Sequence, residues 1–525
     1  MSSRAYENKS ILQQKIMKGA NLLTDNVAST LGPRGRNVLL QEKGKTPFIT
    51  KDGVTVARFV ALEDPFENAG AQIIKQAAIE TNNTAGDGTT TSIVLARAIL
   101  KEAQRYIATG VSPIELQRGI ELGVKEITNT LKEMAGPVTS TEDIEHVASI
   151  SANNDESIGK LIALAFDRVG QDGSITIEES RSLETSLDVT EGFKFDAGYC
   201  AGAFINDERR GIMHHEDPLL LVTDYKISAV EQILPLLEMV ARENRPLVIV
   251  AEEIEGQALA AIIMNAIRGT LKIAAIKAPR YGEDRRNILD DLAMSTGATF
   301  ITRESGTKLQ EVKMTDLGAA KFIESTKYST TIVGGICDFE RVDERINVLK
   351  ALIEQTESMQ ECERIQERIV RLASGVAVIR VGGATEVEMI EKKHRIEDAL
   401  EAVRAAQEEG IVMGGGCALF RASSCMIVKT DSPQQALGAQ IVQDVCKEPI
   451  RQMAINSGES PDLVVEKIRS NPDDRIGWDF KKDHLVNMYK CGIIDPVKVV
   501  RCALQNAASC AGTLITTNYG IIQMD

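Results

Sequence analysis

The spacing of apolar residues changes twice along this chain, and these changes limit the possible folds more than any other feature. From residue 1 to about residue 133, apolar residues recur at helical spacing, as at Ile11, Ile16 and Val27. From about 190 to 375 short apolar runs alternate with helical segments, and helical spacing returns after about 409. Because 525 residues exceed the size of one hydrophobic core, we expect about three domains.

The middle segment has the alternation that is typical of a parallel sheet. Predicted strands cover 219–222, 247–250 and 273–276, and predicted helices cover 230–241 and 256–268 between them. The expected fold class is therefore multidomain α/β and α. Further helices are expected over 69–80, 393–407, 436–453 and 496–511.

Composition places the chain among ordinary globular proteins. Apolar residues make up 43%, charged residues 26% and aromatic residues 4%, so we expect aliphatic cores. A net charge of −15 without a block of Lys and Arg argues against nucleic acid as a partner. No stretch approaches the ~18 apolar residues of a membrane span, and the first residues lack the apolar core of a signal peptide. Nine scattered cysteines without a Cys-x-x-Cys pair argue against a disulfide framework or a zinc site and fit a cytoplasmic location.

Residues 85–91, Ala-Gly-Asp-Gly-Thr-Thr-Thr, directly precede an apolar stretch at 92–100. Glycines let the backbone approach an anion, and the first turn of a helix offers unpaired N–H groups. Asp87 would repel a phosphate unless a hard cation such as Mg²⁺ lay between them. On its own, the segment fits a metal–nucleotide site and an Asp- or Thr-capped helix equally well.

Other segments are ambiguous when they are taken singly. Residues 30–36 form a glycine-rich turn with two cations that could wrap phosphates, and three glycines at 414–416 require a tight bend or a close approach. Asp52 falls at a predicted hairpin turn over 48–56, where Asp-Gly is a strong signal. Asp495 reads as a helix N-cap before Pro496. Asp398 falls on a predicted helix, where a charge usually faces solvent. Neither the Walker motif nor the dinucleotide motif is present.

Taken together, six segments resemble the group I chaperonins of the GroEL type in order and spacing. The match runs nearly from end to end, and several independent motifs keep both their order and their separation. The six segments are 30–38, 51–54, 85–91, 392–400, 414–416 and 492–496, and further similar blocks lie at 191–196, 372–380 and 384–389. Departures from the family pattern are typical of a divergent bacterial or bacteriophage-encoded member.

The resemblance implies the chaperonin fold. It implies an equatorial ATPase domain at 1–133 and 409–525, an intermediate hinge domain at 134–190 and 376–408, and an apical substrate-binding domain at 191–375. It also implies ATP and Mg²⁺ as cofactors, together with K⁺ beside carbonyls of the site. The implied assembly is a homo-oligomeric heptameric ring, single or double, that acts on non-native polypeptides with a cochaperonin as a possible partner.

The resemblance also assigns roles to individual residues. Asp52 and Asp398 match the acids that act on the attacking water, and Asp87 matches the Mg²⁺ ligand. Asp398 would lie on the intermediate domain, so that hydrolysis would depend on domain closure. The implied ATP-binding residues are Thr30, Leu31, Gly32, Pro33, Lys51, Asp87, Gly88, Thr89, Thr90, Thr91, Gly415 and Asp495.

A second implied site would bind unfolded chains in the apical domain. Aliphatic and Met side chains suit a promiscuous surface because they repack against many partners. From the residues alone, a core role in a βαβ layer explains the same side chains at least as well. The implied groove residues are Tyr199, Phe204, Leu234, Leu237, Leu259, Ile263 and Met264.

Several positions depart from the family pattern. The base-side loop at 477–481 reads Gly-Trp-Asp-Phe-Lys, so its adenine contacts cannot be transferred from the family. Ala197 replaces an Arg that pairs across subunits, and Asn83 replaces an acid that pairs with the lysine matched by Lys327, so we expect weak cooperativity. Arg451 is kept, whereas Ser460 stands in place of its acidic partner, which favours a single ring.

The sequence thus favours an ATP-driven folding chamber. A ring-forming holdase or scaffold, in which nucleotide is mainly structural, is the alternative. A small-molecule kinase is disfavoured because no motif for a second substrate is visible.

Overall fold

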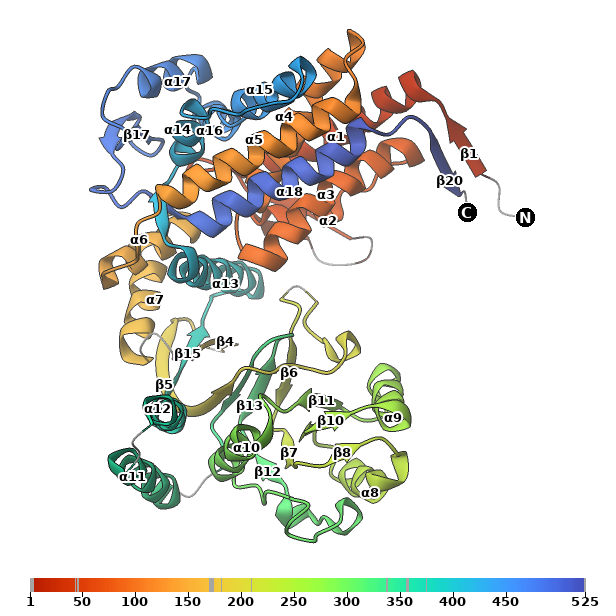
Figure 1. The fold of residues 1–525 in the computed structure, drawn as a ribbon, viewed down its shortest axis with the longest axis vertical. Helices are drawn as coiled ribbons and strands as arrows, with labels where there is room; N and C mark the ends of the chain where they lie inside the picture. The colour runs from red at the N-terminus through yellow and green to blue at the C-terminus, as the bar shows by residue number, and fades with distance from the viewer. Residues whose placement is uncertain are drawn as a thin grey trace. The chain divides into compact units, whose positions relative to one another are not determined.

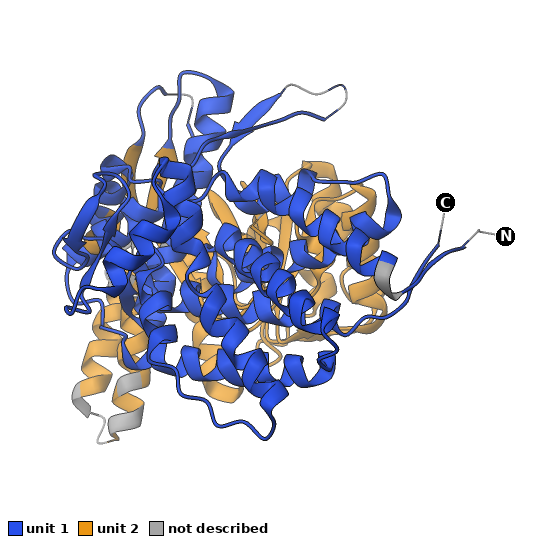
Figure 2. Ribbon diagram, turned by 90° about the horizontal axis from the view of Figure 1, so that it is seen from above, with its two compact units in different colours: residues 1–164, 179–185, 381–525 blue, residues 165–178, 186–380 orange. Residues whose placement is uncertain are grey.

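The computed structural model describes residues 4–42, 44, 47–169, 174–180, 182–208, 210–336, 339–355, 358–373 and 375–523. The chain divides into two compact units (Figure 2). Unit 1 comprises residues 1–164, 179–185 and 381–525, and unit 2 comprises residues 165–178 and 186–380. Each unit therefore contains segments that are far apart in the sequence. Among the described residues, none of the helices combines the length and the apolar character that a membrane span requires.

Unit 1 consists mainly of helices around one aliphatic core (Figure 1). Leu23, Ile93 and Leu504 come from three different helices and are fully buried in this core. The predicted helical character of both chain ends is thus confirmed. The helices are α1 (Lys9–Ala28), α2 (Gly53–Phe59), α3 (Pro65–Ala85), α4 (Thr89–Ala108), α5 (Pro113–Glu133), α6 (Thr141–Ser151), α13 (Glu386–Glu409), α14 (Cys417–Ser424), α15 (Pro433–Val445), α16 (Glu448–Ser457), α17 (Pro461–Arg469) and α18 (Val497–Ile515), and α7 (Glu156–Val169) continues into unit 2.

Four short antiparallel strand pairs complete unit 1. Strand β1 (Arg4–Glu7) pairs with β20 (Gly520–Gln523), which places the two ends of the chain side by side (Figure 1). The pairing of β16 (Ile411–Met413) with β19 (Ile494–Pro496) brings the three glycines that follow β16 next to Asp495. The remaining pairs are β2 (Val38–Leu40) with β3 (Phe48–Thr50) and β17 (Ile476–Asp479) with β18 (His484–Asn487).

The predicted hairpin over 48–56 is wrong. Strand β3 ends at Thr50 and pairs with β2, and Asp52 is the N-cap of α2. The Asp52 carboxylate accepts hydrogen bonds from the backbone N–H groups of Val54 (3.1 Å) and Thr55 (3.2 Å). A carboxylate that satisfies two first-turn N–H groups favours a helix start over a two-residue turn.

The predicted N-cap role of Asp495 is also wrong. Asp495 lies within β19, and Pro496 occupies the N-cap position of α18. Two predicted helices are divided in the structure. The segment 230–241 becomes a short 3₁₀ turn at Val230–Gln232 followed by α8 (Leu234–Glu243), and 436–453 is shared between α15 and α16. A proline lies in the first turn of both α8 and α16, where its missing N–H is tolerated.

A four-stranded sheet forms one layer of unit 2. Strands β7 (Leu219–Val222), β9 (Leu247–Ala251) and β11 (Ile273–Lys277) are parallel, in register at Leu219, Leu247 and Ile273. All residues of β7 and β9 are buried, as expected for strands covered on both faces. The predicted alternation of strand and helix in this segment is therefore confirmed. The fourth strand of this sheet is β12 (Gly318–Ala319). The same part of unit 2 also contains the helices α8, α9 (Gly256–Arg268) and α10 (Gly282–Thr296) and a separate short pair, β8 (Lys226–Ile227) with β10 (Glu253–Ile254).

A six-stranded sheet forms the second layer of unit 2. Phe193, Phe195 and Phe322 are fully buried on it. Two helices follow the strand Thr330–Val333 of this sheet in the sequence. Arg368 on the second helix forms a bidentate ion pair with buried Asp291 of α10 (2.7 and 2.8 Å). The strand order is β4 (Ser174–Glu179), β15 (Gly375–Val381), β5 (Ser186–Phe195), β14 (Thr330–Val333), β13 (Phe322–Ser325) and β6 (Met213–Glu216), and the helices are α11 (Phe339–Gln355) and α12 (Met359–Ala373).

Helices α5 and α15 of unit 1 pack closely because two glycines face the opposite backbone. A Cβ atom on Gly119 would lie 2.0 Å from the Gln435 carbonyl oxygen. A Cβ atom on Gly438 would lie 2.3 Å from the Leu116 carbonyl oxygen. Neither backbone oxygen can move without shifting its helix, so both positions require glycine.

We therefore expect Gly119→Ala to destabilise unit 1 by about 1–3 kcal/mol through overpacking. Gly512→Ala on α18 is the matched control, because its Cβ atom would meet Gln117 at an ordinary 3.4 Å and alanine favours a helix over glycine. Thermal unfolding of both variants measures the difference. Equal melting temperatures for Gly119→Ala and the unmodified chain would contradict this packing argument.

Candidate functional site

A cavity of about 620 Å³ in unit 1 brings together every predicted ATP-site residue and both predicted catalytic acids. Its volume is in the range of small-molecule sites. The walls come from the turn after α1, the start of α2, the start of α4, the end of α6, the middle of α13 and the segment around β19. The predicted residues on its lining are Thr30, Leu31, Gly32, Pro33, Lys51, Asp52, Asp87, Gly88, Thr89, Thr90, Thr91, Asp398, Gly415 and Asp495.

The N-terminus of α4 opens into this cavity without a side-chain cap. Gly86 and Gly88 both adopt left-handed backbone angles (φ 72° and 82°), and Gly88 is the N-cap residue. Among the described residues, no side chain caps this helix, so the alternative of an Asp- or Thr-capped helix is contradicted. The N–H groups of the first turn and the helix dipole therefore favour an anion at this point.

The N-terminus of α2 approaches the same point. A Cβ atom on Gly53 would lie 2.3 Å from Thr90 Oγ1, so only glycine allows α2 and α4 to come this close. The hydroxyls of Thr30 and Thr90 lie 3.3 Å apart, which brings the turn after α1 to the start of α4. Two helix N-termini and a hydroxyl-bearing turn thus converge on one side of the cavity.

Two half-buried carboxylates, those of Asp87 and Asp495, also line the cavity. Burial raises the pKa of Asp87, and the negative charge of Asp52 raises it further. Hydrogen bonds from Ser151 and from the Gly88 N–H lower this pKa and so oppose the shift. Burial raises the pKa of Asp495 to about 7, with a further increase from Asp87, although the Gly415 N–H opposes the shift. Burial is the main cause of both shifts and repulsion between the acids adds to it, and a cation bound beside them would oppose both effects.

Positive groups also face the cavity. Burial lowers the pKa of Lys51, and the nearby positive charge of Arg395 lowers it further while Glu391 opposes the change. Arg395 on α13 pairs with Asp155 (3.1 Å) and with Glu391 (2.7 Å). Asp398 lies one turn further along α13 and is half-buried on the same lining. The dependence of its approach on domain closure remains a prediction.

The donor set fits a cation that arrives with phosphate. In the described parts of the chain, no group of three or more His, Cys, Asp and Glu residues could enclose a metal ion. Mg²⁺ commonly uses one or two carboxylates and completes its octahedral shell with phosphate oxygens and water. Asp87, next to the start of α4, can provide such a carboxylate.

Comparisons with known proteins identify the family and the fold of the chain. A model of the TCP-1/cpn60 chaperonin family matches residues 23–524. The chain belongs to this family. Its structure also resembles the crystal structure of the chaperonin gp146 from the bacteriophage EL 2 (Pseudomonas aeruginosa), determined in the presence of ATP-BeFx, with a TM-score of 0.65. The two sequences are 22% identical, and the alignment covers 99% of each chain. The chaperonin fold predicted from the motifs is thereby confirmed.

The loop at 477–481, which the resemblance places on the base side, contains two buried aromatic residues, Trp478 and Phe480. The Asp479 carboxylate accepts hydrogen bonds from the backbone N–H groups of Lys481 (2.8 Å) and Lys482 (3.2 Å), so it stabilises the loop itself. Trp478 is 3% exposed and stacks under the Lys467 ammonium at 4.7 Å from the ring centroid. Its indole N–H has no hydrogen-bond partner among the described residues. The sole tryptophan of the chain therefore lies at the cavity wall.

The predicted groove residues in unit 2 differ in exposure. Leu234 on α8 and Met264 on α9 are 45% and 46% exposed, and Leu259 and Ile263 are half-buried. Phe204 and Leu237 are buried in the core of unit 2. These two residues therefore have the core role that was the alternative to groove binding. Tyr199 is half-buried and donates its hydroxyl proton to the Gly211 carbonyl oxygen (3.2 Å).

Sequence reasoning missed three residues. Ile267 on α9 is 66% exposed, and its spacing from Met264 along the helix was a usable signal. Ser151 and Arg395 also line the cavity. Arg395 lies within the recognised segment 392–400 but was given no role, and Ser151 belongs to no recognised local motif.

The pKa of Asp495 predicts a pH dependence of stability. Its folded-state value of about 7 lies above the ordinary 3.8, so the folded chain binds more protons than the unfolded chain between these values. Stability contributed by this group therefore falls as pH rises from about 4 to about 7. Asp495→Asn removes this titration. We therefore expect the melting temperature of Asp495→Asn minus that of the unmodified chain to increase as pH rises from about 5 to about 8.

Differential scanning fluorimetry without nucleotide at both pH values measures this gain. Asp474→Asn, at a carboxylate that is 85% exposed, is the control and should leave the pH dependence unchanged. A melting-temperature difference for Asp495→Asn that does not vary with pH would contradict the assignment.

Proposed function

We propose that this chaperonin binds ATP in the cavity of unit 1, hydrolyses it, and couples hydrolysis to the capture and release of non-native polypeptides. One observation carries the proposal: the uncapped N-terminus of α4 and the carboxylates of Asp52, Asp87, Asp398 and Asp495 line a single cavity. Helix N-termini attract an anion and carboxylates attract a cation. A phosphate chain that carries a divalent cation satisfies both requirements.

Different residues of the cavity would bind the phosphates, the divalent cation and the monovalent cation. Backbone N–H groups of residues 89–91 would bind the phosphates, while the N–H of Gly88 is donated to the Asp87 carboxylate beside them. Asp87 would hold Mg²⁺, which when bound neutralises charge on the phosphate oxygens. K⁺ would lie beside the carbonyls of Thr30 and Lys51. Crystallisation of the chaperonin gp146 in the presence of ATP-BeFx supports a nucleotide site in this fold.

The two catalytic acids are not equivalent. Both oxygens of Asp52 accept hydrogen bonds from the first turn of α2, including one from the Thr55 hydroxyl at 2.5 Å. A carboxylate held in this way is suited to orienting the attacking water. We therefore assign acceptance of the water proton to Asp398, which approaches from α13.

Asp398→Ala should retain ATP binding and slow hydrolysis by about 10²- to 10⁴-fold, the usual contribution of a general base. Steady-state ATPase assays combined with refolding of a stringent substrate measure both effects. Glu408→Ala on the same helix, at a side chain that is 58% exposed, is the control. Unchanged turnover in Asp398→Ala would reject the assignment, and negligible turnover in the unmodified chain would favour a holdase.

We further propose that the chain has the domains of its family. The equatorial domain would comprise 1–133 and 409–525, the intermediate domain 134–190 and 376–408, and the apical domain 191–375. The subunits would form a heptameric ring with a cochaperonin as a possible partner. The second compact unit comprises 165–178 and 186–380, and its longer segment supports the apical part of this division.

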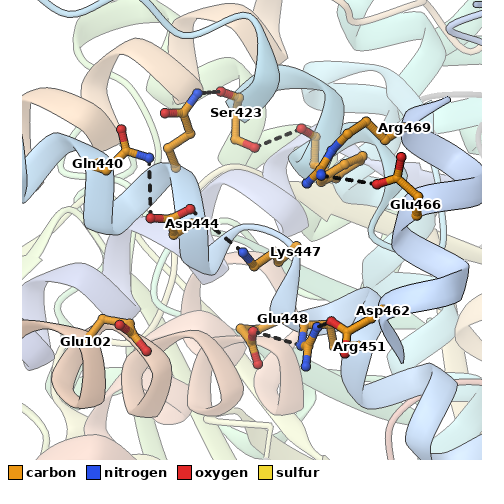
Figure 3. A network of polar contacts seen from close by, with 12 residues as sticks. Glu102, Ser423, Gln440, Asp444, Lys447, Glu448, Arg451, Asp462, Glu466 and Arg469 are labelled. Atoms are coloured by element: carbon orange, nitrogen blue, oxygen red, sulfur yellow. Dashed lines mark hydrogen bonds and ion pairs between the residues drawn. The ribbon is translucent and has the colours of Figure 1, made fainter. Parts of the chain in front are cut away.

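The contacts of Arg451 support a single ring. Its guanidinium group forms ion pairs with Glu448 (3.2 Å) and with Asp462 of the same chain (Figure 3). Neighbouring side chains on α15 and α17 form similar local pairs, such as Asp444 with Lys447 (Figure 3). Because the charge of Arg451 is already compensated, it gains little from an acid on another ring.

We propose that α8 and α9 of unit 2 bind non-native polypeptides through their exposed apolar side chains. Leu234, Met264 and Ile267 provide exposed aliphatic and thioether surface on two neighbouring helices. Such side chains adapt to different apolar sequences because they repack readily. Leu237 and Phe204 would support these helices from the core.

The double variant Leu234→Ser/Met264→Ser should lose most of its capacity to capture a denatured protein while retaining its ATPase activity. Val348→Ser on α11 is the matched control, since Val348 is 52% exposed and belongs to the same unit. Light scattering of an aggregating substrate in the presence of each variant measures capture. Full suppression of aggregation by the double variant would exclude this surface as the capture site.

A further inference from the structure

The hydroxyl of Ser151 makes an unusual contact for a serine in a helix. Several helical serine and threonine hydroxyls of this chain bond to carbonyls three or four positions earlier, as Thr81 does to Ala77 (2.7 Å) and Ser92 does to Thr89 (2.8 Å), and Thr55 bonds to a carboxylate only three positions away. Ser151, the last residue of α6, instead donates to Oδ2 of Asp87 at 2.7 Å. These two residues are 64 positions apart in the sequence.

The Asp87 carboxylate is held at both oxygens. While Ser151 donates to Oδ2, the backbone N–H of Gly88 donates to Oδ1 at 2.5 Å. The carboxylate plane is fixed by these two donors, and the lone pairs that they do not use are left for a ligand. The orientation of Asp87 thus depends on one backbone group and one side chain.

The position of Ser151 is itself determined by its surroundings. Helix α6 starts with a capping box between Ser140 and Asp143, and Ala152, directly after Ser151, is fully buried. Asn153 and Asn154 then adopt consecutive left-handed conformations (φ 60° and 63°). Two such residues in succession are uncommon outside glycine and persist where the surrounding structure requires them.

We propose that Ser151 is a positioning residue for the divalent cation of the nucleotide site. This inference rests on the proposed binding of Mg²⁺ and nucleotide by this cavity. Mg²⁺ requires near-ideal octahedral geometry, so a ligand that can rotate binds it less well than a ligand that is held in place. Hydrogen-bond partners of metal ligands orient them, and loss of such a partner commonly weakens metal binding about 10- to 100-fold.

The test measures the binding of Mn²⁺, a paramagnetic substitute for Mg²⁺, to the full chain that carries one equivalent of ADP. Electron paramagnetic resonance of the free ion gives the Mn²⁺ affinity without any requirement for turnover. Fluorescence of Trp478, the single tryptophan, gives the ADP affinity separately in the presence of EDTA. The two measurements separate metal binding from nucleotide binding.

Ser151→Ala should weaken Mn²⁺ binding about 10- to 100-fold and leave the metal-free ADP affinity unchanged. Ser151→Thr keeps a hydroxyl at this position and should restore Mn²⁺ binding. Thr141→Ala is the matched control on the same helix, because Thr141 is exposed in the first turn of α6, at the opposite end of the helix from Ser151.

Equal Mn²⁺ affinity in Ser151→Ala and the unmodified chain would overturn the proposal, as would loss of Mn²⁺ binding in Ser151→Thr to the extent seen in Ser151→Ala. If the unmodified chain bound no ADP in EDTA or with metal, the proposed function itself would fail. A melting temperature for each variant shows whether it is folded.

Discussion

The burial of the Asp87 carboxylate beside an uncapped helix N-terminus is the constraint on which the rest of unit 1 depends. A buried acid is unfavourable unless donors or a cation compensate its charge, and the hydroxyl of Ser151 and the N–H of Gly88 compensate it only in part. The start of α4 in turn needs an anion for its free N–H groups. A phosphate that carries a cation would meet both demands, which is the ligand of the proposed function.

This arrangement explains why the two ends of the chain are joined. Residues near positions 30, 52 and 87 come from the first part of the chain, and Gly415 and Asp495 come from the last part. Strands β1 and β20 pair the termini, and α1, α4 and α18 share one core. The cavity therefore forms only when both ends have folded together, and unit 2 is inserted between them as a separate compact unit.

Sequence reasoning succeeded where a residue's role is local and failed where its partner is distant. Gly88 and the threonines after it begin a helix because of their own conformational preferences, and the strands of unit 2 follow from short apolar runs. Asp52 was placed in a hairpin because Asp-Gly favours both a turn and a helix start, and only the pairing of β3 with β2 decides between them. Ser151 could not be found, since nothing near it in the sequence indicates Asp87 as its partner. Leu237 and Leu234 look alike in the sequence, but the first is buried and the second is exposed.

The energetics of the site favour a protein whose ligand contributes to its stability. Burial holds the pKa of Asp495 near 7, so at neutral pH the folded chain keeps part of this group protonated or bears an uncompensated charge. A ligand that binds only the folded state stabilises it in proportion to its affinity, and a cation in this cavity would also remove the repulsion between Asp87 and Asp495. Unfavourable burial and repulsion of charged groups are common at functional sites, where binding requires residues that lower the stability of the folded chain. In the proposed function, the cluster of acids that destabilises the chain by itself would therefore increase the free energy that nucleotide and metal binding make available for a conformational change.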